Sequence, residues 1–371
     1  MSKSVQNLVC VNDYEEYARN NLSHMYFEYY HGGAGEEKTL EWNKTGFNKY
    51  RIRPKYMRPV NNRNLSISIL GKPVAFPIGI SPTAFHKLAH RDGECATAKA
   101  TQDLDTIFIL SSHSNSTFEE VIKAAPHGRK WLQMYIFQSR EMIKDFAKVA
   151  EESGFEALVL TVDFTLKGLR RHFLRSEFVT PPHAQFVLLK RYQEKNTISS
   201  FVDLPDLDAD WSCVRWLTTV TKLPIVIKGV LTAEDAIAAA DAGASAILVS
   251  NHGARQLDSL PSTIEALPEV VKAVGHRVEV YMDGGIRDGT DVYKALALGA
   301  RMVFIGRPAI WGLVHGGEQG VKNILTMLKG ELDNAMAITG CSIQEQLVLA
   351  VRFFVDYPSK LYGFQLIPQI L

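Results

Sequence analysis

Eight short apolar runs, each followed by a stretch with helical periodicity, constrain the fold of this chain more than any other feature. The runs occupy residues 78–80, 107–110, 131–134, 157–160, 225–227, 246–249, 278–282 and 302–305. Each is too short for a helix and mostly apolar, as buried parallel strands are. The helical stretches occupy residues 93–103, 117–125, 139–153, 211–221, 232–242, 261–274, 289–298 and 309–329. The series predicts a (β/α)₈ TIM barrel of the α/β class over residues 76–330.

An open doubly wound sheet of the Rossmann type is the alternative architecture for alternating strands and helices. It would carry a Gly-x-Gly-x-x-Gly turn after its first strand, and that turn is absent from this sequence. Several predicted helices end in glycine, at Gly154, Gly243 and Gly299, as helices that stop before a strand commonly do. These observations favour the barrel.

The segments outside the predicted strands and helices are expected to complete a single domain over residues 1–371. Tyrosines and other apolar residues at helical spacing predict one helix over residues 13–30, capped by Asn12 or Asp13, within an N-terminal helical cover at 1–75. Residues 331–371 are expected to form a helical tail on the outside of the barrel, running to about Val355. Residues 164–210 form a long loop after the fourth strand, where a lid or substrate loop is expected.

Composition and charge exclude several classes of function. A net charge of +1 gives no electrostatic basis for binding nucleic acid or an anionic membrane, and no apolar run is long enough to span a bilayer. The four cysteines are scattered without metal-ligand spacing, which predicts no metal site and fits a reducing compartment. The first residues lack the pattern of a secretory signal, so a soluble intracellular protein is expected.

Polar and charged residues follow the predicted strands, at the end where barrel enzymes build their active sites. These residues are Thr83, Ser111, Gln133, Tyr135, Thr161, Asp163, Lys228, Ser250, His252, Arg255, Asp283, Arg287, Gly306 and Arg307. Chance could place a polar residue at two or three strand ends, but hardly at all of them. The sequence therefore predicts an active site or a ligand site at this end of the barrel.

The two last strands are followed by a pattern typical of phosphate sites in such barrels. Asp283-Gly284-Gly285-Ile286-Arg287 follows the seventh strand and Gly306-Arg307 follows the eighth. Glycines expose backbone N–H groups, and guanidinium groups donate to phosphate in pairs. The alternative is a pair of ordinary glycine turns with surface arginines.

The stretch Ser-Asn-His-Gly-Ala-Arg-Gln-Leu-Asp at residues 250–258 follows the sixth strand. A histidine such as His252 is a natural general base near neutral pH, and a carboxylate such as Asp163 would fix its tautomer. Arg255 and Arg170 suit a carboxylate substrate through charge-assisted hydrogen bonds. Considered singly, His252 could sit in an ordinary turn, and Arg170 could form a solvated basic pair with Arg171.

Lys228 ends an apolar strand, so it is more than an ordinary surface lysine. A fixed positive charge at that position would stabilise an electron-rich ring, such as a reduced flavin. A lysine that forms a Schiff base is the competing interpretation.

Nine segments of the chain together resemble the FMN-dependent L-2-hydroxy acid oxidase family, which includes glycolate oxidase, from about residue 8 to about residue 345. They are Tyr29-Tyr30 before Gly33-Ala34, Pro82-Thr83-Ala84, Leu110-Ser111-Ser112, Gln133-Met134-Tyr135, Leu160-Thr161-Val162-Asp163, Lys228-Gly229-Val230, residues 250–258, Asp283-Gly284-Gly285 and Ile305-Gly306-Arg307-Pro308. The stretch at 250–258 is the most specific of them.

The resemblance implies FMN as cofactor and assigns roles to the residues at the strand ends. FMN would contact Pro82, Thr83, Ala84, Ser111, Gln133, Thr161, Lys228 and Ser250, with its phosphate on Asp283, Gly284, Gly285, Ile286, Arg287, Gly306 and Arg307. The catalytic residues would be His252 as base, Asp163 behind it, Tyr135 and Tyr29; the substrate would contact Tyr29, Tyr135, Arg170, His252 and Arg255. The reaction implied is oxidation of an L-2-hydroxy acid to the 2-oxo acid, with O₂ reduced to H₂O₂.

The family resemblance further implies a homotetramer and a peroxisomal location. The tripeptide Ser359-Lys360-Leu361 is present, but ten residues follow it, and an internal copy is not read as a C-terminal address. A cytoplasmic location therefore stays open beside the peroxisomal one.

Three departures from the family's pattern concern the substrate. His113 replaces a tryptophan of glycolate-preferring relatives, Phe164-Thr165 replaces Thr-Pro after Asp163, and Arg170-Arg171-His172 resembles the medium- and long-chain branch. These residues predict a preference for longer or bulkier 2-hydroxy acids over glycolate. Two other functions stay open: a dehydrogenase that uses an acceptor other than O₂, and a catalytically silent barrel that binds a phosphorylated ligand.

Overall fold

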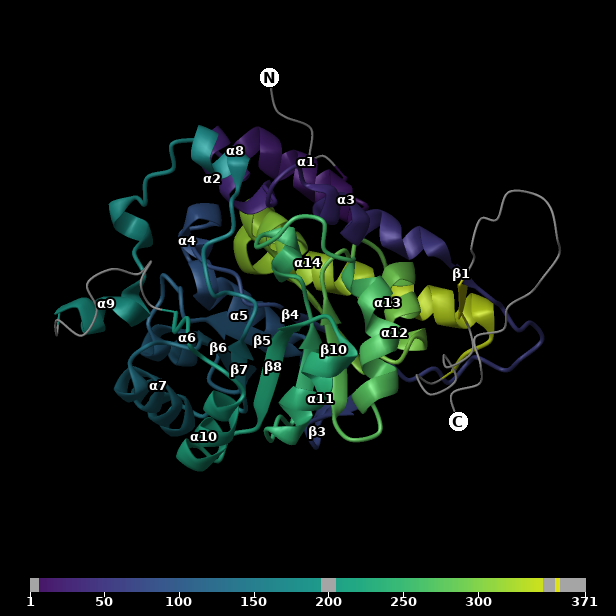
Figure 1. Ribbon diagram of the computed structural model, residues 1–371. Helices are drawn as coiled ribbons and strands as arrows, with labels where there is room; N and C mark the ends of the chain where they lie inside the picture. The colour runs from purple at the N-terminus through teal and green to yellow at the C-terminus, as the bar shows by residue number, and fades with distance from the viewer. Residues whose placement is uncertain (1–6, 195–204, 343–350, 354–371) are drawn as a thin grey trace, which may run out of the picture.

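The centre of the computed structural model is a closed barrel of eight parallel strands, β4 to β11 (Figure 1). The structure describes residues 7–194, 205–342 and 351–353. The barrel strands are Ile78–Ile80 (β4), Ile107–Ser111 (β5), Arg129–Tyr135 (β6), Leu158–Thr161 (β7), Ile225–Val230 (β8), Ala246–Val249 (β9), Glu279–Asp283 (β10) and Met302–Ile305 (β11). Every strand pairs with its neighbours in sequence, and β11 closes the ring on β4. The predicted barrel is confirmed, and each predicted strand overlaps the observed one.

Helices follow the strands and cover the outside of the barrel. They are Gly93–Asp103 (α5), Phe118–Ala124 (α6), Arg140–Glu152 (α7), Ser212–Val220 (α10), Ala233–Asp241 (α11), Thr263–Val274 (α12), Gly289–Ala297 (α13) and Arg307–Thr339 (α14), with the short His86–Ala89 (α4) before α5. Thr117, Ser139 and Thr232 cap three of these helices with their side-chain oxygens. The alternation of buried strands and amphipathic helices therefore folds as its periodicity predicts.

Strand register sets the height of the polar residues at the mouth of the barrel. Ser111 lies opposite Gln133, and Thr161 lies opposite both Tyr135 and Lys228. Residues at one height in neighbouring parallel strands point toward the same region. The carboxyl ends of the strands therefore bring these side chains together.

A β-hairpin closes the opposite end of the barrel and was not predicted. Its strands are Ile67–Ile69 (β2) and Lys72–Val74 (β3), and its turn residues Leu70 and Gly71 have φ values of 49° and 77°, as a two-residue hairpin turn requires. Ile69 and Val74 pack among the aromatic side chains that fill the barrel interior. The sequence alone does not predict this hairpin, because its short apolar alternation packs on the barrel interior.

The N-terminal cover lies across the mouth of the barrel, at the end opposite β3 (Figure 1). It consists of Val11–Asn21 (α1), His24–His31 (α2), Lys38–Thr45 (α3), the 3₁₀ turn Gly46–Lys49 (η1) and the strand Tyr50–Ile52 (β1). The single helix predicted at 13–30 is wrong, because α1 ends at Asn21 and Ser23 starts a second helix, accepting a hydrogen bond from the Tyr26 N–H at 3.3 Å. The predicted cap is also displaced: Cys10 is the N-cap, and Asp13 accepts from its N–H at 3.1 Å.

The predicted helical tail is confirmed over residues 331–339 and wrong at residues 351–353. Residues 331–339 complete α14, which ends at Gly340 in the left-handed conformation with a φ of 73°. A Cβ at Gly340 would lie 2.0 Å from the carbonyl oxygen of Lys55, so the backbone packs there too closely for another residue. Val351–Phe353 (β12) then pairs antiparallel with β1. The rest of the predicted tail lies outside the described residues.

The long connection after β7 carries short helices of its own. These are Arg171–Arg175 (α8), Pro182–Ala184 (η2) and Val187–Glu194 (α9). α8 lies against α2 of the cover, where His172 contacts the Glu28 carboxylate at 3.2 Å. Within the described ranges, no helix has the length and apolar character needed to cross a membrane.

Candidate active site

A cavity of about 510 Å³ opens at the carboxyl ends of the strands, beneath the N-terminal cover. Its size is that of a site for a cofactor-sized ligand. The predicted site residues that line it are Tyr29, Pro82, Thr83, Ala84, Ser111, Gln133, Tyr135, Thr161, Arg170, Lys228, His252, Arg255, Asp283, Gly284, Gly285, Ile286, Arg287, Gly306 and Arg307. The two remaining ones, Asp163 and Ser250, lie behind His252 and Lys228 and contact them directly.

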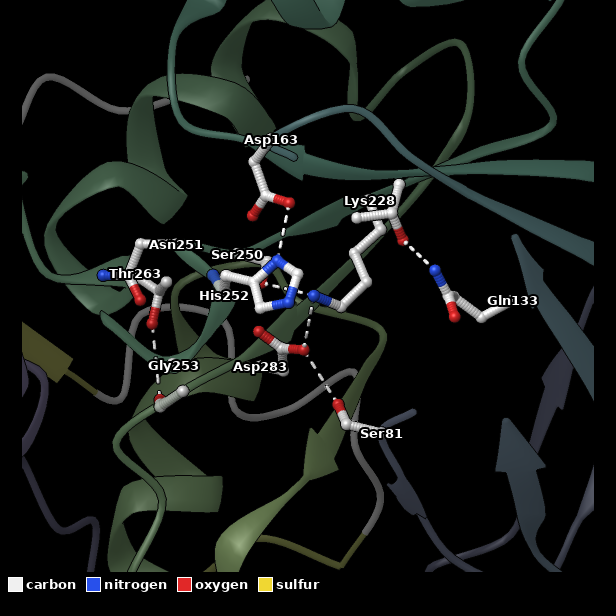
Figure 2. A network of polar contacts seen from close by, with 12 residues as sticks. Ser81, Gln133, Asp163, Lys228, Ser250, Asn251, His252, Gly253, Thr263 and Asp283 are labelled. Carbon is white, nitrogen blue, oxygen red and sulfur yellow. Dashed lines mark hydrogen bonds and ion pairs between the residues drawn. The ribbon is translucent and has the colours of Figure 1, made fainter. Parts of the chain in front are cut away.

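His252 and Asp163 form a close pair at the centre of the site (Figure 2). The Nδ1 atom of His252 lies 2.8 Å from Oδ1 of Asp163, whose Oδ2 has no hydrogen-bond partner among the described residues. This contact makes Nδ1 the donor and leaves Nε2 as the basic nitrogen of a neutral ring. Burial lowers the pKa of His252, and Asp163 counteracts part of that effect. Burial alone would raise the pKa of Asp163, but the charge and the hydrogen bond of His252 bring it below its usual value.

The backbone that carries His252 is a left-handed turn. His252, Gly253 and Ala254 have φ values of 59°, 61° and 62°, which are unfavourable for the two residues that are not glycine. Asn251 holds the turn by accepting from the Ala254 N–H at 3.1 Å, and the Ala254 carbonyl accepts from Ala34 of the cover at 2.8 Å. The strained conformation thus turns the imidazole toward the cavity.

Lys228 is held by a polar network under the same cavity (Figure 2). Its Nζ donates to the Ser250 hydroxyl at 2.9 Å and lies 3.5 Å from Oδ2 of Asp283, which also accepts from Ser81 at 2.8 Å. A lysine paired with a buried carboxylate is an ammonium, which is not nucleophilic. The geometry favours the fixed-charge interpretation of Lys228 over the Schiff base.

Asp283, the first residue of the 283–287 segment, contacts Lys228 and Ser81. Its Oδ1 is buried and has no partner among the described residues. A carboxylate accepts hydrogen bonds and repels phosphate, so Asp283 suits a hydroxyl-bearing part of a ligand better than the phosphate assigned to it from the sequence.

Gln133 orients the neighbouring strand ends. Its Nε2 donates to the Thr161 hydroxyl at 3.0 Å, while its Oε1 accepts from the Ser111 hydroxyl at 3.3 Å and from the Ser112 N–H at 3.2 Å. These contacts assign the oxygen and the nitrogen of the Gln133 amide and fix its orientation toward the cavity. Gln133, Thr161 and Ser111 therefore form one rigid wall.

The four residues of the predicted carboxylate clamp come from four separate elements. Arg170 precedes α8, and its Nε is buried without a partner among the described residues. Burial, and the charge of Arg255 beside it, lower the pKa of Arg170 to about 10, so it remains charged at neutral pH. Burial raises the pKa of both Tyr29 and Tyr135, and both phenols stay protonated donors. Two cations and two hydroxyl donors therefore face one region.

Arg255 also holds the cover in place. Its Nη1 donates to the carbonyl oxygens of Tyr29, Tyr30 and Gly32, at 2.8, 3.2 and 3.3 Å. These are carbonyls at the end of α2, where the helix leaves its acceptors free. Sequence reasoning assigned Arg255 to substrate alone and missed this second contact.

The other end of the cavity is lined by glycines and half-buried cations. Gly284 and Gly285 have φ values of 94° and 82°, and Gly306 precedes α14. Arg287 is half-buried, and its Nε is buried without a partner among the described residues. Arg307 donates to the carbonyls of Tyr30, Gly253 and Gly32, at 2.8, 2.8 and 3.1 Å, and burial lowers its pKa to about 9.

Half-buried cations with an unused N–H, beside a glycine turn, fit a terminal phosphate. The orphaned carboxylate oxygen of Asp283 and the ammonium of Lys228 fit the hydroxyl-bearing and electron-rich parts of the same molecule. The residues present therefore fit FMN.

The wall beyond His252 is aromatic and was only partly foreseen. The His113 ring lies 5.2 Å from that of Tyr135 and 4.5 Å from that of Phe186, and Phe164 lies 4.8 Å from Tyr135. Burial, with the charge of His252, lowers the pKa of His113 to about 4, so this ring is neutral. Other lining residues that sequence reasoning missed are Lys44, Phe85, Lys167, Phe173 and Phe178. For Lys167, Phe173 and Phe178, the Lys and Phe content of the 164–210 loop was the only signal, and Lys44 and Phe85 carried none.

Comparisons with known proteins agree with this geometry. The model of a family described as FMN-dependent dehydrogenase matches residues 18–351. The chain is 43% identical over 345 residues to 2-hydroxyacid oxidase 1 of Homo sapiens, which covers 90% of this chain and 93% of that protein. It is 44% identical over 339 residues to a peroxisomal (S)-2-hydroxyacid oxidase of Arabidopsis thaliana, with 90% and 93% covered.

Among solved structures, mandelate oxidase with (S)-2-phenylpropionate superposes with a TM-score of 0.85 at 36% sequence identity. The match covers 92% of this chain and 97% of that one.

Proposed function

The chain belongs to the FMN-dependent dehydrogenase family, and from that premise we propose that it oxidises L-2-hydroxy acids to 2-oxo acids with O₂ as final acceptor. The observation that carries the proposal is the His252–Asp163 pair, 2.8 Å apart, on a cavity that Arg170 and Arg255 also line. A base beside two cations suits a carbinol next to a carboxylate.

The proposed reaction balances as two half-reactions. The substrate loses two electrons and two protons as its C–H and O–H bonds break and the C=O bond forms; O₂ gains two of each and becomes H₂O₂. FMN, when bound, takes up the electrons from the substrate and delivers them to O₂. Pro82, Thr83, Ala84, Ser111, Gln133, Thr161, Lys228 and Ser250 would hold its ring region, with Gly284 to Arg287, Gly306 and Arg307 at its phosphate.

In this proposal, His252 Nε2 takes a proton from the carbinol group. Asp163 then stabilises the imidazolium that forms, because its carboxylate already accepts from Nδ1. Arg170, Arg255, Tyr29 and Tyr135 hold the carboxylate of the substrate and so orient its carbinol toward His252. Lys228 keeps positive charge beneath the site through its contact with Asp283.

The reaction class can be tested on purified protein. An L-2-hydroxy acid added without air is expected to bleach the visible absorbance of the flavin, and admission of air is expected to restore it with release of H₂O₂. A dehydrogenase that uses another acceptor would bleach but produce little peroxide. A silent barrel would not bleach.

We expect a preference for longer or bulkier substrates over glycolate, because His113 replaces a larger ring and Phe164 adds apolar surface beside Tyr135. The kcat/KM for 2-hydroxyoctanoate should exceed that for glycolate, with roughly tenfold discrimination from a few buried methylenes. His113→Trp should narrow the wall and reduce this ratio. A wild-type kcat/KM that is higher for glycolate would contradict the proposed preference.

The pH dependence follows from the lowered pKa of His252. A base must be unprotonated, so kcat/KM should fall only as the pH drops through a value below 6.5, the ordinary pKa of the ring. Asp163→Asn removes the negative charge that raises the pKa of His252, so the acid limb should move to still lower pH. The plateau of kcat/KM should fall at the same time, by a hundredfold or more on the order of related charge removals. Steady-state profiles of both proteins measure these effects, and an unmoved limb in the variant would argue against the pair.

Two further features are proposed on family likeness alone. A peroxisomal location accords with the name of the Arabidopsis relative. A homotetramer is the assembly that the family resemblance implies. Imaging of the tagged full chain and light scattering of the holoenzyme test these two proposals.

A further inference from the structure

A third cation joins Arg287 and Arg307 at the phosphate end of the cavity, and it comes from the cover instead of the barrel. Lys44 is the penultimate residue of α3 and lines the cavity together with those arginines. It makes no ion pair with a described residue. Its half-buried ammonium therefore faces two guanidinium groups without a partner of its own.

The position of Lys44 is fixed by its neighbour, Asn43. The amides of Asn43 and Asn251 exchange two hydrogen bonds, at 2.9 and 2.8 Å, and both side chains are buried. The Asn43 backbone also packs on the glycine turn so closely that a Cβ at Gly285 would lie 1.9 Å from its carbonyl oxygen. α3 is thus seated on the turn that leads to Arg287, and Lys44 is presented to the cavity by a rigid support.

Positive charges outnumber negative ones around Lys44 at this end of the cavity. Burial, and then the charge of Arg287, lower the pKa of Lys44. The opposing carboxylates are Glu41, three residues earlier in α3, and Glu15 of α1, which is already paired with His31 at 3.2 Å. Burial alone would raise the pKa of Glu15, but His31, Arg287 and Lys44 bring it to about 2, so one carboxylate serves several cations. An excess of half-buried positive charge favours the binding of an anion that would balance it.

We propose that Lys44 is a further ligand of the FMN phosphate, so that the N-terminal cover retains the cofactor that the barrel binds. The inference rests on the proposed function for the presence of FMN. A dianionic phosphate would supply the charge that the cluster lacks, and it would tie α3 to Arg287 and Arg307 across the cavity. Riboflavin, which has the same ring without phosphate, would gain nothing from Lys44.

The test compares FMN and riboflavin on apoprotein by quenching of flavin fluorescence. Lys44→Met should raise the Kd for FMN about tenfold and speed its release, because a charge-assisted contact is lost. Its Kd for riboflavin should stay that of the wild type, which also reports that the variant is folded. Lys44→Arg should keep FMN affinity near the wild-type value. Lys38→Met, on the exposed side of α3, is the matched control and should change neither Kd.

Two results would overturn the role of Lys44: an unchanged FMN affinity in Lys44→Met, or equal losses for FMN and riboflavin, which would indicate general damage to the cover. A wild-type protein that binds neither flavin would instead overturn the proposed function, and this inference with it.

Discussion

Replacement of His252 by Asn is expected to lower kcat by about a thousandfold while the protein stays folded and yellow, because proton transfer by a positioned base contributes on that order. Asn is chosen because it tolerates the left-handed φ of 59° at this position better than most residues do. Anaerobic stopped-flow measurement of flavin bleaching reports the loss at the step in which the substrate is oxidised.

The control for this prediction is an exposed histidine remote from the cavity. His127→Asn makes the same chemical change outside the site and should leave kcat unaltered. A His252→Asn protein that kept more than about a tenth of the wild-type kcat would remove His252 from the role of base.

Replacement of Lys228 by Met should cost about 3–5 kcal/mol of the free energy of unfolding, the largest loss of stability that we expect from the site. The side chains of Lys228 and Asp283 are only 5% and 8% exposed, and 3.5 Å separates Nζ from Oδ2. Without the ammonium, Asp283 becomes a buried charge with no cation beside it. Urea denaturation of the apoprotein measures the change without interference from bound flavin.

A second substitution separates electrostatics from packing in that result. In Lys228→Met with Asp283→Asn, the orphaned charge is gone, so most of the lost stability should return. If the double variant is as unstable as the single one, lost packing and not the ion pair explains the defect. Lys222→Met, at an exposed position just before β8, should change stability by less than about 0.5 kcal/mol.

The barrel and much of its site could be predicted because both rest on local patterns. A buried strand, a polar end and a glycine-terminated helix are each encoded within a dozen residues, and β4, β9 and β11 begin and end where their apolar runs do. Once the strands are in order, the fold itself brings their polar ends together. The pairing of His252 with Asp163 was expected from the chemistry of the two residues and from the family resemblance, and the 2.8 Å contact gives it a geometry.

What the sequence did not reveal depends on contacts between distant segments. Ser23 acts as a helix cap inside an otherwise continuous helical pattern, and the 67–74 hairpin has a role only against the closed end of the barrel. Lys44 carried no signal because only its seat on the 284–287 turn brings it to the cavity. Arg255 looked like a substrate ligand alone because the α2 carbonyls it contacts lie 223 to 226 residues earlier.

The hydrogen bonds from Arg255 and Arg307 to the carbonyls at the end of α2 have a consequence for folding during synthesis. α2 is synthesised before the barrel strands, yet Arg307, which donates to its Tyr30 carbonyl, lies 277 residues later. Contacts of such long range form late, since the intervening chain must be ordered first. Tyr29 and the turn of His252 therefore reach their final places in the last stage of folding. A partly synthesised chain is thereby kept from having a working oxidase site before its barrel is closed.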